Sequence, residues 1–376
     1  VCTTNASYPL GSSVTLTVTQ GSGAIIAWST AGCSGTTCKV TLGGPTTVNV
    51  TTTTKNIVFI SSGQHAANFG SVAAAAPFCN TAAKAAGVPG TFVAFLGTAT
   101  VTPFASLGSA RGWIRPDGLP MTDTVAGFQN NQTMWYPPSL NELAARDTSQ
   151  FYEGTNPSST CGDWTLTTGS SNGGESAADE GSRFFGLEGV PCSGAPVMCF
   201  GTDFATAVSV TAVAGRHAFI SSSYFTPSGG LAGADAMCQS LASSAGLANP
   251  THFLALLSTT KASGASRFNL NGANWVRPDG VQIAASTTDF MAGNFIAPVS
   301  VEETGVVSGP DAWTGATMGV THVSGSVNES CDDWTSAAST ANGSFTDPHY
   351  GSSNAFAVFG PMACNSGFGE LFCLEN

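Results

Sequence analysis

Charged side chains are scarce in this sequence, and their scarcity excludes several classes of partner. Asp, Glu, Lys and Arg together make up 9% of the 376 residues, whereas soluble globular proteins average about 25%. Only 11 residues are Lys or Arg, and the formal net charge is -12. Nucleic acids and anionic membrane surfaces are bound by clustered basic side chains. We therefore expect no nucleic acid and no membrane surface as a partner.

Long apolar runs and metal-ligand spacings are missing as well. No apolar run approaches the roughly 18 residues that span a bilayer, so we expect no membrane insertion. The five histidines are scattered and no C-x-x-C pair occurs, which excludes the usual zinc patterns. Hydrophobic residues nevertheless make up 42% of the chain, which is enough for folded cores.

A long internal repeat is the most informative feature that is present. VFISS (58–62) returns as AFISS (218–222), WIRPDG (113–118) as WVRPDG (275–280), and CGDWT (161–165) as CDDWT (331–335). An offset of 160 to 170 residues matches a whole domain rather than a solenoid repeat. We expect a small all-β module in residues 1–54 and two copies of one α+β domain in residues 55–205 and 206–376.

Local patterns predict the elements within each part. In the leader, alternating and apolar runs predict strands at residues 13–19, 24–30, 38–42 and 46–54. Each copy opens with an apolar strand, and a helix follows that ends at Gly87 or Gly246, where glycine suits a left-handed cap. Pro77 is expected in the first turn of its helix, where a missing N–H costs nothing. The RPDG blocks favour type I turns.

The cysteines indicate an oxidising compartment. Each copy carries a matching quartet: Cys79, Cys161, Cys192 and Cys199, then Cys238, Cys331, Cys364 and Cys373. Four cysteines allow three pairings, so the connectivity stays open at this point. Cys33 and Cys38 bracket a short SGTT loop in the leader and could close it, whereas Cys2 is left unpaired or intermolecular. We expect a secreted protein, extracellular or at the cell surface; because the chain begins at Val1, we also expect that a signal peptide was removed.

Several blocks carry a family resemblance. CNTAAKAAGVPGTFVAFL (79–96), CDDWT (331–335) and FCLEN (372–376) resemble parts of endostatin, and GLAGADAMC (230–238) with CxDWT resembles a family of bacterial secreted proteins of the same fold. The resemblance covers residues 56–203 and 216–376. It implies tandem C-type-lectin-like domains, each with a helix pair, two small antiparallel sheets and a long irregular loop region. The leader, with GSSVTLTV and GCSGTTC, resembles the short β-repeats of bacterial surface proteins.

The resemblance also implies a disulfide pattern. Its nested pairing would join Cys79–Cys199 around Cys161–Cys192 in the first copy, and Cys238–Cys373 around Cys331–Cys364 in the second. The outer bridge of each copy would tie the first helix to the last strand. With Cys33–Cys38 in the leader, ten cysteines are then assigned.

Calcium and catalysis are the two chemistries that the sequence supports least. Sugar-binding lectins of this fold hold calcium with E-P-N or Q-P-D and W-N-D strings, and none of these occurs. We therefore expect no cofactor; the alternative left open is calcium on Glu329, Asp332 and Asp333. GSSNG (169–173) matches a hydrolase pattern, but that pattern needs a strand before it and a helix after it. We expect no enzyme.

Ligand recognition is expected in the loops, where the copies differ most. The candidate residues are Trp135, Tyr136, Glu175, Asp179 and Arg183 in the first copy, and Asp347, His349 and Tyr350 in the second. For each, the competing interpretation is a side chain that is solvated or packs on its own domain. The function expected is adhesion: an extracellular, non-catalytic protein that binds a glycan or a protein. The alternative is a structural subunit that self-assembles into an extracellular filament or sheath.

Overall fold

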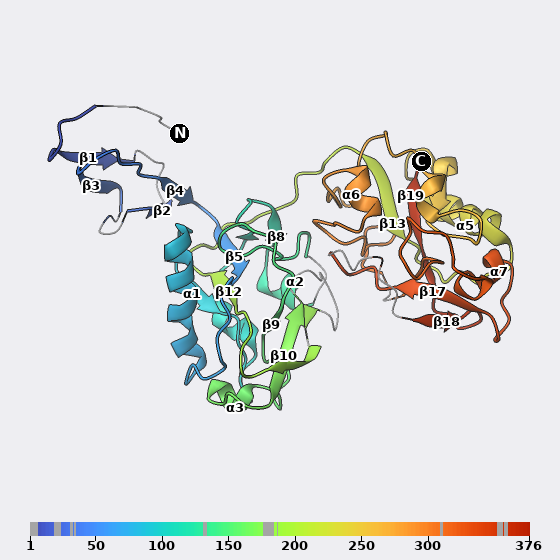
Figure 1. The fold of residues 1–376 in the computed structure, drawn as a ribbon, viewed down its shortest axis with the longest axis horizontal. Helices are drawn as coiled ribbons and strands as arrows, with labels where there is room; N and C mark the ends of the chain where they lie inside the picture. Colours follow the sequence, from blue (N-terminus) through green and yellow to red (C-terminus); the bar gives the residue numbers. More distant parts are fainter. Residues whose placement is uncertain are drawn as a thin grey trace.

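The computed structural model describes residues 7–18, 24–30, 33, 35–130, 134–175, 184–185, 187–308, 311–351, 356 and 360–376. It is a mixed α+β structure in which strands are more numerous than helices. Figure 1 shows the leader followed by two bodies, each with its own sheet and its own long helix. Asp179, Arg183 and Cys2 lie outside the described residues.

The leader forms two small antiparallel sheets. β1 (Ser13–Thr17) pairs with β3 (Thr37–Thr41), and β2 (Ile25–Trp28) pairs with β4 (Val50–Thr53). These strands match the four expected runs; β1, β2 and β4 are shorter than expected, and β3 begins one residue earlier. A disulfide joins Cys33 to Cys38, and the Trp28 indole N–H donates to the Gly35 carbonyl at 2.9 Å. The loop between the two cysteines is thereby fastened at both sides.

In the first copy the opening strand pairs with the closing strand. The main sheet has the order β6-β12-β5-β7-β8, in which β5 and β12 are antiparallel neighbours. A separate sheet has the order β11-β10-β9. The strands are β5 (Asn56–Ile60), β6 (Phe92–Ala94), β7 (Trp113–Ile114), β8 (Pro120–Thr122), β9 (Gln150–Tyr152), β10 (Ser170–Glu175), β11 (Leu187–Pro191) and β12 (Met198–Gly201).

The second copy repeats this pairing of opening and closing strands. β13 is antiparallel to β19, β14 pairs with the other side of β19, and β15 runs parallel to β13. Its smaller strands join the same sheet, because β16 also pairs with β19. The strands are β13 (Arg216–Ile220), β14 (Phe253–Ala255), β15 (Trp275–Val276), β16 (Ala312–Trp313), β17 (Asn342–Thr346), β18 (Pro361–Ala363) and β19 (Glu370–Glu375).

One long helix lies against the sheet of each copy (Figure 1): α1 (Val72–Ala86) against β6, and α5 (Gly230–Ser244) against β14. The other helices among the described residues are short, so each copy shows one long helix there. The short ones are α2 (Val125–Gln129), α3 (Cys161–Trp164), α6 (Thr287–Met291) and α7 (Cys331–Trp334), with 3-10 turns η1 (Pro103–Leu107), η2 (Pro250–His252), η3 (Gly264–Arg267) and η4 (Val327–Glu329).

The ends of α1 confirm one expectation and correct another. Gly87 caps the helix in the left-handed region, at φ 71°, as expected. Pro77 was wrongly expected in the first turn: it lies inside the helix, because the side chain of Ser71 accepts the Ala74 N–H and starts the helix earlier. In the second copy α5 ends at Ser244, two residues before the expected Gly246, which does lie in the left-handed region at φ 71°.

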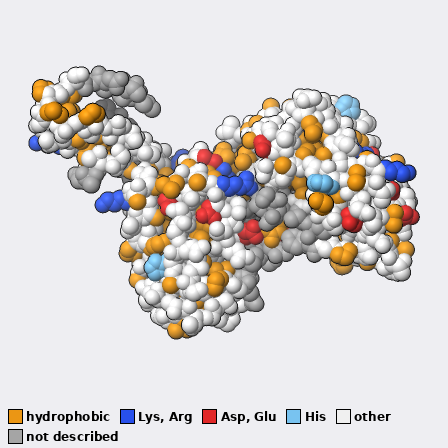
Figure 2. Space-filling view, viewed as in Figure 1, with side chains coloured by type: hydrophobic (Ala, Val, Ile, Leu, Met, Phe, Trp, Pro, Cys, Tyr) orange, Lys and Arg blue, Asp and Glu red, His pale blue; other side chains and the backbone are white. Residues whose placement is uncertain are grey.

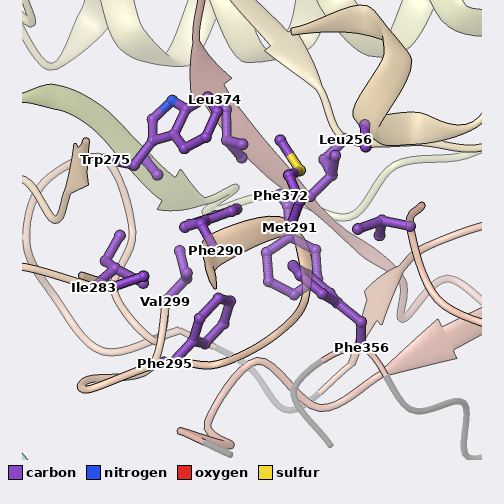
Figure 3. Packing of buried hydrophobic residues seen from close by; sticks show 14 of the residues in the cluster. Leu256, Trp275, Ile283, Phe290, Met291, Phe295, Val299, Phe356, Phe372 and Leu374 are labelled. Carbon is purple, nitrogen blue, oxygen red and sulfur yellow. The ribbon is translucent and has the colours of Figure 1, made fainter. Parts of the chain in front are cut away.

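Aromatic side chains fill the core on one face of each sheet. Figure 3 shows this packing in the second copy, where the Trp275 and Phe290 rings lie 4.9 Å apart and Phe290 and Phe295 lie 5.0 Å apart. The Trp275 indole N–H donates to the Glu375 carbonyl at 2.8 Å. In the first copy the Trp113 indole makes the equivalent bond to Gly201, at 2.9 Å. The tryptophans of the repeated RPDG blocks thus bind the closing strands.

Disulfides fasten the same elements in both copies. Cys79–Cys199 joins α1 to β12, and Cys238–Cys373 joins α5 to β19. The second bridge of each copy, Cys161–Cys192 or Cys331–Cys364, lies between those two cysteines in the sequence. These are the pairs that the family resemblance implies. Each outer bridge closes a loop of more than a hundred residues, which stabilises the fold by about 4–5 kcal/mol on a chain-entropy model. Five disulfides fit an oxidising, extracellular compartment.

The repeated FISS block supplies a polar contact from an exposed serine to a buried carboxylate in each copy. The Ser62 N–H donates to Glu142 Oε2 at 2.9 Å, and the Ser62 hydroxyl donates to the other carboxylate oxygen. In the second copy the Ser222 N–H and hydroxyl donate to Glu303 at 3.2 and 2.5 Å. Both glutamates are buried. The second serine of the block therefore ties the opening strand to a distant loop.

Removing either glutamate should destabilise its own copy. In Glu142→Ala or Glu303→Ala the N–H and hydroxyl of an exposed serine lose a charged acceptor that water can replace, so we expect a loss of about 0.5–1.5 kcal/mol in the free energy of unfolding. Urea unfolding with the disulfides intact measures it. The control is Thr81→Ala on the exposed face of α1; equal stability of all three variants would contradict the assigned contact.

Candidate functional site

The CxDWT block forms the same strained turn in both copies. Four consecutive residues have positive φ: 49°, 62°, 52° and 68° at residues 161–164, and 49°, 54°, 52° and 68° at residues 331–334. Each non-glycine residue in this region costs roughly 1–2 kcal/mol. The surrounding contacts must therefore hold the turn in place.

Those contacts come from the Asp and the Trp of the block. Asp163 Oδ1 accepts the Ala99 N–H at 2.8 Å, and the Trp164 indole donates to the Gly97 carbonyl at 2.6 Å. In the second copy Asp333 accepts from the Thr260 N–H at 2.7 Å, and Trp334 donates to Ser258 at 2.8 Å. The block thus fixes the loop that follows β6 or β14.

The carboxylates of the three calcium candidates either accept hydrogen bonds already or are exposed to solvent. Both oxygens of Asp333 accept from Thr260, and Glu329 Oε2 accepts the N–H groups of Gly325 and Thr317 at 2.9 and 3.3 Å. Asp332 is exposed. Among the residues that the structure describes, no group of three or more His, Cys, Asp or Glu side chains is arranged to hold a metal ion.

Acidification should weaken the second copy through Asp333. Burial alone would raise the pKa of this carboxyl, but hydrogen bonds from Thr260 and Ser330 and the charge of Lys261 outweigh burial and lower the pKa below its ordinary 3.8. A depressed pKa stabilises the fold above the unfolded value, near 4, and the contribution is lost as the pH falls through the folded pKa. It amounts to less than about 1 kcal/mol, because solvent screens the group.

Urea unfolding of the wild type and Asp333→Asn between pH 2 and pH 7 measures this contribution, over a range that brackets the ordinary carboxyl pKa of about 4. We expect the wild type to be more stable at neutral pH and the difference to vanish at the acid end. A difference that grows on acidification would contradict the assigned pKa direction.

Three loop candidates of the second copy are buried rather than displayed. Asp347, His349 and Tyr350 are 7%, 6% and 6% exposed. The Nδ1 atom of His349 lies 2.7 Å from Asp347 Oδ1, and Tyr350 packs in the main core cluster. Their burial matches the competing interpretation, in which these side chains pack on their own domain; ligand binding by them stays a prediction. Glu175, at the end of β10, is half-buried opposite Gln150.

Trp135 and Tyr136 lie where the two copies meet. Tyr136 is 2% exposed and packs with Val281 and Ala297 of the second copy, with Trp135 beside it. Its hydroxyl accepts the Gln282 N–H at 3.0 Å. The buried Arg115, which binds Asp117 of its own RPDG turn at 2.5 Å, also donates to the Ile296 carbonyl at 3.2 Å. These aromatic residues join the copies, and ligand binding by them stays a prediction.

Tyr136→Ala should loosen the two copies without unfolding either. We expect a loss of about 2 kcal/mol or more in the free energy that couples them, because a buried aromatic anchor and its hydrogen bond are removed together. Small-angle X-ray scattering should then show a larger radius of gyration. The matched control is Tyr224→Ala, an exposed tyrosine of the second copy; an unchanged radius in Tyr136→Ala would contradict the interface.

An apolar pocket in the first copy was not expected from the sequence. It has a volume of about 450 Å³ and lies between α1, β6 and η1. Its lining includes Val72, Ala76, Val93, Ala94, Ala105 and Ser106. The sequence signal that could have located it is a difference between the copies: AAAAPFC (73–79) stands where the second copy has AGADAMC (232–238).

The chain matches no protein-family model, and a search of curated proteins finds none similar to it. In the part of the chain that the structure describes, no helix is long and apolar enough to cross a membrane. The internal repeat and the contacts above are therefore the basis for assigning a function.

Proposed function

We propose that this chain is an extracellular, non-catalytic adhesion protein whose two copies are C-type-lectin-like, endostatin-like domains that bind a glycan or a protein ligand. Three shared features support the proposal. Each copy closes by pairing its first and last strands, carries two nested disulfides, and devotes a long, irregular segment to loops. A rigid frame that presents variable loops is typical of binding domains.

The main support for the proposal is that the polar groups of the repeated blocks bind other groups of the same copy. Ser62 binds Glu142, Arg115 binds Asp117, and Asp163 holds the Ala99 N–H. The same three contacts recur in the second copy. The polar contacts that the two copies share therefore stabilise the fold. Ligand recognition is then assigned to the surfaces where the copies differ.

The distribution of charge favours a neutral ligand surface. Figure 2 shows Lys, Arg, Asp and Glu side chains as small groups scattered over this face. Electrostatic attraction to a polyanion needs a continuous basic surface. Hydroxyl-rich glycans and weakly charged protein surfaces suit this chain better.

Binding arrays test the proposal directly. The full-length, oxidised chain is applied to panels of glycans and extracellular matrix proteins, with reduced and alkylated chain as the control. We expect saturable binding that disappears after reduction, because the loops are held by the disulfide frame. A parallel arm in EDTA distinguishes a calcium-dependent lectin site from a calcium-independent one. Absence of native-specific binding on both panels would contradict adhesion.

A filament subunit is the second candidate, and the leader supplies its specific observation. Its described strands form only two-stranded sheets, β1 with β3 and β2 with β4, so each strand has an open edge that a strand from another molecule could join. Electron microscopy with light scattering of unreduced material tests it. Regular fibres would support a filament; monomers at every concentration would contradict it.

A further inference from the structure

Two residues of β6 have backbone N–H and C=O groups that point away from the neighbouring strand β12, on the side of the pocket. In the ladder with β12, the Phe95 N–H donates to the Met198 carbonyl at 2.8 Å and the Thr202 N–H donates to Thr91 at 3.0 Å. Antiparallel ladders alternate, so the N–H and C=O groups of Phe92 and Ala94 point away from β12. They form an outer edge that other groups must satisfy.

A carboxamide satisfies the first of these two residues. Asn80, on α1, accepts the Phe92 N–H with Oδ1 at 2.9 Å and donates from Nδ2 to the Phe92 carbonyl at 2.7 Å. The flat amide thus pairs with both backbone groups of one residue. This contact shows which chemical group fits the outer edge of the strand.

The second residue, Ala94, is only partly satisfied. Its carbonyl accepts the Leu96 N–H at 2.9 Å, but no described group accepts its own N–H. Ala94 lines the apolar pocket and is buried. None of the described residues that line the pocket carries a charge.

In the second copy the same position is filled by an ion pair. Asp235 accepts the Ala255 N–H at 3.0 Å, Arg267 donates to the Ala255 carbonyl at 2.6 Å, and the two side chains meet at 2.6 Å. Aligning the helices on their disulfide cysteines places Ala76 where Asp235 stands, and aligning η1 with η3 places Ser106 where Arg267 stands. The pocket exists because two short side chains replace a pair that would fill it.

We propose that the first-copy pocket binds a small neutral molecule that carries a carboxamide on an aliphatic or aromatic body. The amide oxygen accepts the Ala94 N–H and the amide N–H donates to the Ala94 carbonyl, as Asn80 does at Phe92. The body occupies the space lined by Val72, Ala76 and Val93. A carboxylate is disfavoured because burial without a cation is costly.

Titration with benzamide tests the proposal, with the full-length oxidised chain observed by ¹⁵N NMR. We expect saturable one-to-one binding with a dissociation constant on the order of 1 mM, in the range that a ligand of this size reaches. The Ala94 amide should be among the resonances that move most. Benzoate, which has the same shape with a charge, should bind at least about tenfold more weakly.

Exchanging the two side chains between the copies supplies matched variants. Ala76→Asp with Ser106→Arg should abolish binding, because it rebuilds the ion pair of the second copy. Asp235→Ala with Arg267→Ser should open a second pocket and raise the stoichiometry toward two. Near-UV circular dichroism checks folding; if the first double variant does not fold, Ala76→Leu fills the pocket instead.

Two results would overturn the proposal. One is the lack of saturable benzamide binding up to about 50 mM, far above the expected constant. The other is binding that persists in the folded Ala76→Asp/Ser106→Arg or Ala76→Leu variant. The amide pocket goes beyond adhesion and does not depend on it, since the arrays and the benzamide titration can succeed or fail separately.

Discussion

The antiparallel pairing of the first and last strands is the contact on which each copy depends. It brings Phe59 opposite Cys199 in the first copy and Phe219 opposite Cys373 in the second. The same cysteines bridge to the long helices. Because the two strands are more than a hundred residues apart in the sequence, every element between them is held in a closed loop.

The outer edge of β6 and of β14 is a second constraint on the fold, because its backbone groups also need hydrogen-bond partners. The closing strand pairs with each of them on one side only, so backbone groups on the other side face the long helix and need partners. At the first outward position the copies agree in part: Asn80 binds Phe92, and Gln239 donates to the Phe253 carbonyl at 3.2 Å. At the second position they diverge, and a structural ion pair in one copy corresponds to a pocket in the other.

Much of the disulfide-linked fold of each copy was predictable, because its characteristic sequence blocks occur twice in the chain. The matching cysteine quartets and the repeated FISS, RPDG and CxDWT blocks indicated two copies of one α+β unit, and an apolar strand, β5 or β13, does open each copy. Local signals were enough for the Gly87 cap. They misplaced Pro77, because the side chain of Ser71 starts the helix earlier than the proline does.

The candidate site was harder to predict, because it depends on contacts between distant residues. Nothing local shows that Tyr136 meets Gln282, or that Tyr350 turns into the core. The sequence shows that Ala76 stands where the second copy has Asp235. The effect of this difference becomes clear only when the structure shows that the Ala94 N–H points away from β12. Asp179 and Arg183 lie outside the described residues and stay predictions.

Hydrogen exchange at two equivalent backbone amides tests the central claim most directly. In the unliganded chain the Ala255 N–H is bound by a carboxylate, whereas the Ala94 N–H faces the pocket. A hydrogen bond to a charged group contributes about 1.5–3 kcal/mol, so we expect the Ala94 amide to exchange at least about tenfold faster than Ala255. Equal protection of the two amides would contradict the claim that one copy has an open edge where the other has an ion pair.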